Sequence, residues 1–182
     1  MPNWCENELV IRGIKEDLDK FKKDMGEKLL DEEKLIPYPK KFREQDEVAR
    51  EWEAKASEYA KKVGKEGAKN WYCGDKLTKK QRDGFIKEFG ERPKDGFSSS
   101  GYNWCIKNWD TKWGFCDVLK EYETKEKICY SFLTAWSPPL KLIETMAEKY
   151  PKLEIRLTYV ERGVGFSGYA VYENGILIAS SE

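Results

Sequence analysis

The side chains best suited to recognise a ligand lie in one short stretch, residues 102–115, where large aromatic rings alternate with lysine and small polar residues. An aromatic face can stack on a planar ring such as a nucleobase, and each such stack contributes about 1–3 kcal/mol. Lysine, asparagine and threonine side chains can then fix the orientation of the ligand. The candidate ligand-binding residues of this stretch are Tyr102, Trp104, Lys107, Asn108, Trp109, Thr111, Lys112 and Trp113.

Two further tryptophans, Trp4 and Trp136, stand near the ends of predicted strands and can join this stretch at one edge of a sheet. In the ligand-binding interpretation the tryptophans supply stacking surface. Lys107 and Lys112 meet phosphate charge, and Asn108 reads one edge of the bound ring.

The competing interpretation is that the tryptophans are core residues that hold an irregular loop in place. Residues 102–115 follow neither a clean helical period nor a clean strand period, so core burial explains the pattern only in part. Replacement of Trp109 by alanine is expected to abolish binding and leave the fold intact. A variant that unfolds would instead support the core interpretation.

A glycine-rich run at residues 163–168 adds Gly165 and Phe166 to the candidates. The run resembles a loop that holds phosphate, but it leads into a predicted strand, so the helix N-terminus of a dinucleotide-binding motif is missing. We interpret it as a tight turn or bulge before a hairpin. A contact between its backbone amides and an anion is the alternative.

Several kinds of catalytic and metal site are excluded or disfavoured by composition. Histidine is absent, which excludes Ser–His–Asp and Cys–His nucleophile systems within the chain. The carboxylates occur in runs, such as residues 31–33, that are typical of solvated surface. We expect no catalytic residues, no metal, no cofactor and no enzymatic activity. The five cysteines are widely spaced without a C-x-x-C pair, which predicts unpaired buried thiols: Cys5, Cys73, Cys105, Cys116 and Cys129.

The charge balance bears on the kind of partner. Lysine plus arginine and aspartate plus glutamate each number 33 in the 182 residues, so the formal net charge is zero. A protein that holds nucleic acid chiefly through phosphates usually has a basic excess, so nucleic acid is disfavoured as a partner. Residues 1–7 lack the features of a signal peptide and no apolar run could span a bilayer. We expect a cytoplasmic protein without a membrane partner.

The first part of the chain reads as a strand, a helix and a charged insertion. Residues 5–12 alternate with Leu9 and Ile11 on one face, and apolar residues recur at helical spacing from Lys15 to about Leu29. Residues 31–101 form a helical insertion, with an extended segment at 35–39, a helix at 46–63 and a Gly/Ser loop at 93–101. A second helix is predicted from Thr78, which caps it, to Gly90, with Phe85, Ile86 and Phe89 facing inward. The helix at 46–63 has one apolar stripe that is expected to face inward: Val48, Trp52, Ala56, Tyr59, Ala60 and Val63.

The second part of the chain resumes the sheet. Strands are predicted at residues 117–123, 128–134 and 153–159, and a helix starts after Ser137 as N-cap with Pro138 at its first position. Its predicted buried face consists of Leu140, Ile143, Met146, Ala147 and Tyr150. Residues 166–172 and 176–179 form a hairpin whose Asn174-Gly175 pair suits a type I′ turn.

This order predicts an α+β protein, a ferredoxin-like βαββαβ sheet with a helical insertion after the first helix and a C-terminal β-hairpin. We expect one α+β domain over residues 1–182, with residues 31–101 inserted in it. Two helices pack on one face of the sheet, and the insertion or an oligomeric partner is expected to cover the other. Self-association through an open face or edge is plausible.

Several motifs together resemble a known family. They are Met1-Pro2-Asn3-Trp4-Cys5-Glu6-Asn7, Leu35-Ile36-Pro37, the run from Trp104 to Trp113, Thr134-Ala135-Trp136-Ser137-Pro138-Pro139 and Gly165-Phe166-Ser167-Gly168. In these motifs the chain is similar to the YubB-like group of ferredoxin-like proteins of phages and conjugative plasmids. The resemblance implies a ferredoxin-like core and a mobile-element origin. It implies no activity and no catalytic residue.

Four functions compete at this point. The leading hypothesis is a non-enzymatic phage or plasmid accessory protein that binds a small nucleotide-like ligand, for example to sequester a host defence signal, in the host cytoplasm. The alternative is a protein-binding module that blocks or recruits a host factor. The third hypothesis is single-stranded nucleic-acid binding. The fourth is a hydrolase that works through carboxylates, lysine, tyrosine or a metal.

Overall fold

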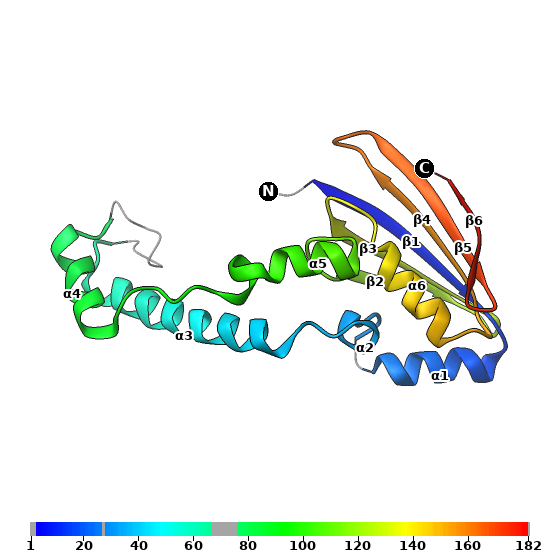
Figure 1. Cartoon of the computed structure of the whole chain (residues 1–182), viewed down its shortest axis with the longest axis horizontal. Coiled ribbons are helices and arrows are strands. Elements are labelled where there is room, and N and C mark those ends of the chain that lie inside the picture. Colours follow the sequence, from blue (N-terminus) through cyan, green and yellow to red (C-terminus); the bar gives the residue numbers. More distant parts are fainter. Residues whose placement is uncertain (1–2, 27, 67–75, 182) are drawn as a thin grey trace. The chain divides into compact units, whose positions relative to one another are not determined.

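The computed structural model describes residues 3–26, 28–66 and 76–181. Its backbone divides into two compact units, Met1–Tyr38 with Tyr102–Glu182 as unit 1 and Pro39–Gly101 as unit 2. Cys73 and residues 67–75 of the predicted insertion, like Met1 and Pro2 of the first motif, lie outside the described residues. Each unit is described by itself below (Figure 1).

Unit 1 is built on one six-stranded antiparallel sheet in the order β2-β3-β1-β4-β5-β6. The order β2-β3-β1-β4 is that of a split βαβ fold, and the hairpin β5-β6 extends it beyond β4. The predicted ferredoxin-like α+β class is therefore confirmed. The strands are β1 (Trp4–Arg12), β2 (Cys116–Glu123), β3 (Lys127–Ala135), β4 (Glu154–Glu161), β5 (Phe166–Glu173) and β6 (Ile176–Ser181).

The register aligns apolar residues of the central strands on one face. Leu9 of β1 stands opposite Tyr130 of β3 and Leu157 of β4, and all three side chains are buried. Helices α1 (Lys15–Met25) and α6 (Leu140–Lys149) contribute Leu18, Phe21 and Met25, and Leu142, Ile143, Met146 and Ala147, to the core. The predicted alternation is confirmed for residues such as Leu9, Ile11 and Ile155, although Val10 and Cys129, which pair on the opposite face, are also buried.

The predicted end of the first helix was wrong, and one helical turn in unit 1 was not predicted. Helix α1 ends at Met25 because Gly26 adopts φ 74°, so Leu29 lies beyond the helix and is 37% exposed. The single turn α2 (Glu32–Leu35) was not predicted; it meets the predicted extended segment 35–39 only at Leu35, and Ile36 after it is extended. At the hairpin, Asn174 and Gly175 have φ values of 53° and 78°, as a type I′ turn requires.

Unit 2 contains α3 (Lys40–Val63), α4 (Lys79–Phe89) and the π-helical turn η2 (Phe97–Gly101). Trp52, Ala56 and Phe85 form its buried cluster, with Tyr59 packed against it. The predicted capping box of α4 is confirmed, since Thr78 and Gln81 each accept from the other's backbone amide. The segment predicted as a Gly/Ser loop is helical over residues 97–101.

Some residues predicted to face inward in unit 2 are exposed. Val48 is 53% exposed because the buried stripe of α3 passes one residue later, through Ala49. In α4, Ile86 and Phe89 are 36% and 42% exposed, although the Phe89 ring stacks on Phe85 with 4.6 Å between centroids. A short two-helix unit has too little depth to bury every apolar residue of its helices.

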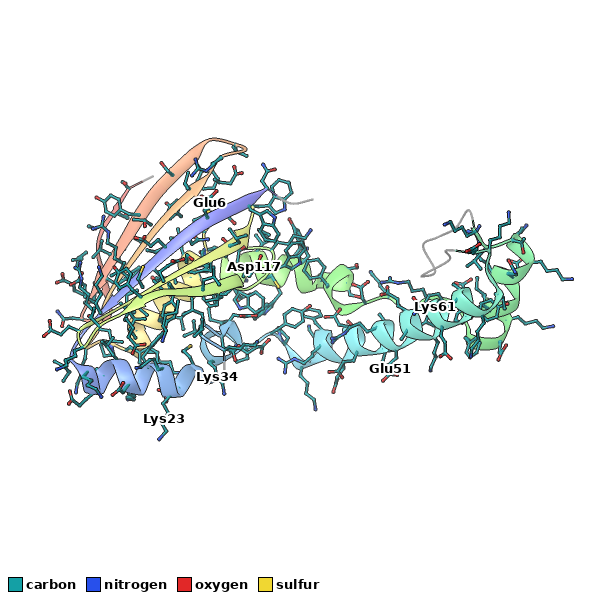
Figure 2. The ribbon with its side chains drawn as sticks, turned by 180° about the vertical axis from the view of Figure 1, so that it is seen from behind. Glu6, Lys23, Lys34, Glu51, Lys61 and Asp117 are labelled. Carbon is teal, nitrogen blue, oxygen red and sulfur yellow. The ribbon has the colours of Figure 1, made fainter. Side chains whose placement is uncertain are left out.

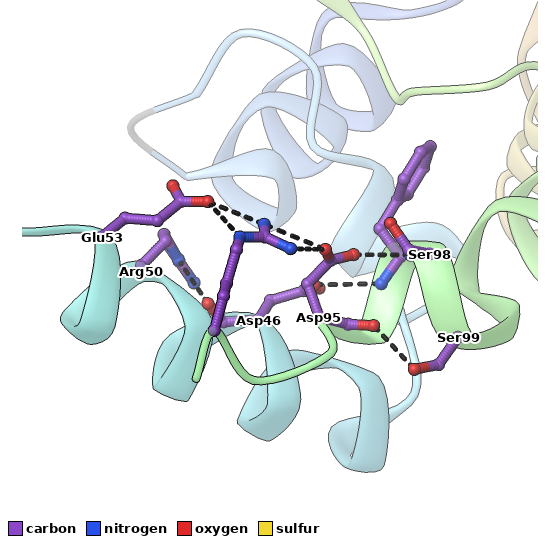
Figure 3. A network of polar contacts seen from close by, with 8 residues as sticks. Asp46, Arg50, Glu53, Asp95, Ser98 and Ser99 are labelled. Atoms are coloured by element: carbon purple, nitrogen blue, oxygen red, sulfur yellow. Dashed lines mark hydrogen bonds and ion pairs between the residues drawn. The ribbon is translucent and has the colours of Figure 1, made fainter. Parts of the chain in front are cut away.

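A polar network joins α3 to the turn before η2 (Figure 3). The guanidinium of Arg92 donates to Glu53 at 2.7 Å and to Asp95 at 3.1 Å. Asp95 also accepts from the backbone nitrogen of Ser98, and these bonds hold the pKa of its carboxyl below the usual value. Asp46 of α3 accepts from the backbone nitrogen of Phe97 at 3.0 Å. The network fixes the start of η2 on α3.

Candidate functional site

The stretch singled out by its tryptophans forms helix α5 (Tyr102–Trp109) and a short loop that leads into β2. The helix was not predicted, although Cys105 and Trp109, four residues apart, are its two buried residues. Asn108 donates its side-chain amide to the backbone oxygen of Trp104 at 2.8 Å, within the same helix. Asn108 therefore contacts its own helix, and the rings around it form two separate groups of paired rings.

The first aromatic cluster consists of Tyr38, Trp104 and Trp109, of which Trp109 is buried and the other two are half-buried. The ring centroids of Trp104 and Trp109 lie 5.3 Å apart, and Tyr38 lies 5.6 Å from Trp104 and 5.9 Å from Trp109. Trp109 is only 5% exposed and its indole nitrogen donates to the backbone oxygen of Ile36 at 2.8 Å. We therefore assign Trp109 to the core, in place of the expected ligand contact, because its ring has no face open to a ligand.

The exposed aromatic cluster consists of Trp4 and Tyr102, which are exposed, and of Lys112 and Trp113, which are half-buried. The Trp4 and Trp113 ring centroids lie 6.0 Å apart with a tilt of 46°. The ammonium nitrogen of Lys112 lies 4.6 Å from the Trp113 centroid and 6.0 Å from that of Tyr102. Trp4 and Tyr102 are 38% and 42% exposed. Figure 2 labels Glu6 on β1 and Asp117 on β2, the strands whose first residues adjoin this cluster.

The loop that carries Lys112 and Trp113 is attached to the sheet by a hydrogen bond from Thr111. Thr111 is fully buried and its hydroxyl donates to the backbone oxygen of Ala135, the last residue of β3, at 2.9 Å. Thr111 is thus an anchor and not a ligand contact. A bound ligand would meet side chains whose backbone is already ordered, which lowers the entropic cost of binding.

Asp110 is a second anchor of this loop, and sequence reasoning missed it. Its carboxylate accepts from the backbone nitrogen of Lys141 at 3.0 Å and forms an ion pair with the Lys141 ammonium at 2.9 Å. The helix start was predicted to be capped by Ser137, but Pro139 is the N-cap residue of α6. Ser137 instead donates its hydroxyl to the backbone oxygen of Asp110. A cap supplied from a distant segment leaves no local pattern in the sequence.

Two of the remaining candidates have no ring pair and no cation–π contact with either ring group in the described part of the chain. Trp136 is 45% exposed, adopts φ 75° and donates its backbone nitrogen to Asn3. Its backbone thus adjoins that of Trp4, but among the described residues its ring pairs with no ring of either cluster. The side chain of Lys107 is exposed, and its backbone oxygen accepts from the Lys141 ammonium at 2.7 Å.

The glycine-rich run is a turn, in agreement with the preferred interpretation. Gly165 has φ 90° and donates its backbone nitrogen to the oxygen of Glu161. The amides of Gly163 and Val164 donate to the carboxylate of Glu161, which is 1% exposed. Because these amides already bind a carboxylate, they are occupied and do not offer an open anion site.

Phe166 lines a separate hollow of about 330 Å³, together with Asp110, Ser137, Pro138, Leu140 and Tyr159. Its ring lies edge-on to Tyr159 with 6.2 Å between centroids. The lining is mostly apolar. Phe166 therefore belongs to this hollow and is not part of the exposed aromatic cluster.

A buried polar group on the covered face of the sheet is structural. Asn7 donates its side-chain amide to Thr134 at 2.9 Å, and Thr134 donates to the backbone oxygen of Ser137 at 2.8 Å. Burial raises the pKa of Cys5 to about 11, against a smaller lowering by its hydrogen bond with Thr134. A thiol with this pKa is protonated at neutral pH and is a weak nucleophile.

Of the twelve candidates, then, the structure brings together Trp4, Tyr102, Lys112 and Trp113 in one partly exposed group, and Trp104 and Trp109 in the other. Within the described residues, no three Cys, Asp or Glu side chains come together as a metal site, and no helix is long and apolar enough to cross a membrane. The chemistry that the exposed group offers is therefore recognition of a planar, negatively charged molecule by ring faces and one ammonium.

The comparisons with known proteins agree with the fold. Residues 108–182 match the model of a family described as a ferredoxin-like domain in Api92-like protein. The matched part covers the end of α5 and strands β2 to β6, so it includes Lys112 and Trp113 but not Trp4 or Tyr102.

A crystal structure of protein api92 from Yersinia pseudotuberculosis is similar to the whole chain, with a TM-score of 0.56 and 12% identity over 100% of this chain and 98% of that one. At this identity the likeness shows the fold alone. No curated protein sequence matches. The resemblance to the YubB-like group, and the mobile-element origin that it implies, stay predictions.

Proposed function

We propose that this chain is a non-enzymatic binding protein that takes a small nucleotide-like ligand at the exposed aromatic cluster. The observation that carries the proposal is the contact of Lys112 with two rings, its ammonium nitrogen 4.6 Å from the Trp113 centroid and 6.0 Å from that of Tyr102. This places a positive charge next to aromatic surface that is partly exposed. A nucleotide presents the matching pair, a planar base and a phosphate.

The energetics of such a site favour a small ligand over a long nucleic acid. One or two stacked rings contribute about 1–3 kcal/mol each. A single lysine supplies only local charge, and the chain has no net positive charge with which to hold a phosphate backbone. A mononucleotide or dinucleotide needs no more than this local complementarity.

The biological role proposed is sequestration of a nucleotide-like signal. In the cytoplasm of a host cell, an accessory protein of a phage or plasmid would bind such a molecule without turning it over. The YubB-like resemblance supports this setting, and the anchoring of the loop by Thr111 supports binding by a preformed site. A host protein is the alternative partner.

Native mass spectrometry of the purified protein tests the proposal, followed by mass analysis of whatever denaturation releases. The wild type is expected to carry an intact nucleotide-like molecule that the Trp113→Ala and Lys112→Ala variants lose. Tyr122→Ala is the matched control, because Tyr122 is an exposed ring with Lys127 4.8 Å from its centroid, on β2 away from the cluster. A wild-type mass without any bound molecule would contradict the nucleotide-like ligand and favour a protein partner instead.

A further inference from the structure

The two edges of the six-stranded sheet differ in their suitability for pairing with another strand (Figure 1). Edge strand β2 carries the exposed charged residues Lys120, Glu121 and Glu123, and its register with β3 shifts at two places. Charges and bulges on an edge strand oppose the addition of a further strand. The β2 edge is therefore protected.

The opposite edge, β6, lacks this protection. Its six residues, Ile176–Ser181, include no charged residue and no proline. Ile176, Leu177 and Ile178 are 67%, 47% and 54% exposed. Its register with β5 shifts once, at Ile178, and is regular from Ala179 to Ser181. In the described part of the chain β6 pairs with β5 alone, so one side of its backbone has hydrogen-bonding groups without strand partners.

We propose that β6 pairs in antiparallel fashion with β6 of a second copy of this chain, which extends one sheet through both copies. Two identical strands that run antiparallel are related by a two-fold axis, so the same surface serves both partners. Because β6 is uncharged, self-pairing brings no like charges together. Its exposed aliphatic side chains instead cover one another across the pair.

The contrast between the edges explains why the second copy would use β6. If β2 paired with itself about a two-fold axis at Tyr122, Glu121 would stand opposite Glu123 of the copy, and like charges directly opposite destabilise a pair. An interface made of one six-residue strand is smaller than the roughly 1,200–2,000 Å² of typical stable complexes, so a concentration-dependent dimer is expected. This inference does not depend on the proposed ligand.

Sedimentation velocity over a range of concentrations up to about 300 µM tests the inference. The wild type is expected to become a dimer at the upper end and Ile178→Lys to stay a monomer, because a charge on the edge opposes pairing. Leu119→Lys is the matched control and is expected to dimerise like the wild type, since Leu119 is a 62% exposed aliphatic residue on the other edge strand. A monomeric wild type at the highest concentration, or an Ile178→Lys variant that still dimerises, overturns the inference.

Hydrogen exchange of the unmodified protein keeps the test decisive if the Ile178→Lys variant does not fold. The backbone amides of β6 are expected to exchange more slowly as the concentration rises, whereas those of β2 exchange at a constant rate. Protection of β6 that does not depend on concentration, or protection that grows on β2 instead, contradicts pairing through β6.

Discussion

The carboxylate of Asp110 caps helix α6 across a gap of 31 residues, by accepting from the backbone nitrogen of Lys141 at 3.0 Å. The same carboxylate lies 2.9 Å from the Lys141 ammonium. This one side chain therefore joins the start of α6 to the loop that carries Lys112 and Trp113. Any change that frees Asp110 should loosen the exposed aromatic cluster as well as the helix.

Replacement of Asp110 tests this link. Asp110→Ala is expected to lower the free energy of unfolding by about 1–2 kcal/mol, because it removes a cap. Alanine also tolerates the φ of 61° at this position less well than aspartate or asparagine does. Asp110→Asn should lose much less, since its amide oxygen can still accept from Lys141. Urea unfolding of the three proteins measures the difference, and equal losses in both variants would contradict the capping role.

The division of the rings into two groups predicts different costs for two tryptophan substitutions. Trp109→Ala should lower the free energy of unfolding by about 3–5 kcal/mol, because it removes a buried ring from the core. Trp113→Ala should lower it by less, about 2 kcal/mol, because this ring is only half-buried and its removal exposes less of the core. Urea unfolding followed by circular dichroism compares them. A Trp109→Ala variant as stable as the wild type would return Trp109 to the ligand-binding candidates.

A surface network around Lys22 predicts a loss of stability in acid. Lys22 pairs with Asp19 of the same helix and with Glu123 of β2. Hydrogen bonds from Lys120 and Lys22 hold the pKa of Glu123 below its usual value of 4.5, and bonds from Lys15 and Lys22 do the same for Asp19. A carboxyl with a lowered pKa stabilises the fold above its usual pKa, and that stabilisation is lost as pH falls through the folded-state value.

The Lys22→Met variant checks this pH dependence. Its urea midpoint is expected to fall less than that of the wild type as the pH drops below about 4.5, because an uncharged methionine side chain no longer favours the ionised carboxylates. Lys23→Met is the control, since Lys23 is an exposed lysine on the same helix without an ion pair to Glu123 among the described residues. Parallel acid profiles for the wild type and Lys22→Met would rule out this network as a source of acid sensitivity.

The carboxyl group of Glu32 predicts the opposite pH dependence of stability. A Cβ atom at Gly114 would lie 2.3 Å from the carboxyl carbon of Glu32, so this side chain packs on the backbone just after Trp113. Burial raises the pKa of its carboxyl above the usual value, against a smaller lowering by Lys28. The folded chain then holds this proton more tightly than the unfolded chain. The contribution of Glu32 to stability therefore falls as the pH rises from its usual pKa to the higher pKa of the folded state.

Glu32→Gln is therefore expected to be more stable than the wild type at pH 7, because the half-buried group no longer has to ionise. The difference should shrink towards zero below the usual pKa of 4.5, where the carboxyl is protonated in both states. Urea unfolding at several pH values measures it, with the exposed Glu148→Gln as a control. A variant that is less stable than the wild type at pH 7 would show that the charge of Glu32 is stabilising.

Periodicity was sufficient to predict the sheet. Alternating residues such as Leu9 and Ile11 are buried as expected, and the Asn174-Gly175 pair forms the predicted turn. Both features are local consequences of the sequence, since strand side chains alternate and a type I′ turn needs two positive φ values. The start of α6 was misplaced because its cap comes from Asp110, which is distant in the sequence.

The candidate site was predicted less well. Residue types indicated an aromatic and lysine group, and four of the twelve candidates do meet in one exposed cluster: Trp4, Tyr102, Lys112 and Trp113. The sequence could not show that Trp109 and Thr111 point inward, because their burial depends on Ile36 and Ala135, which lie in other elements. Composition identifies the kinds of side chain present, whereas tertiary contacts decide which of them face solvent.

Nuclear magnetic resonance of the seven tryptophan indole groups tests the proposed ligand site most directly, with AMP, GMP, CMP and UMP as separate probes. The account predicts that at least one probe shifts the indole signals of Trp4 and Trp113. The indoles of Trp52 and Trp109 should not move, because they are buried and donate to Gly90 and Ile36. No shift of Trp4 or Trp113 with any probe at about 10 mM, a concentration that reveals even millimolar affinity, would contradict the account.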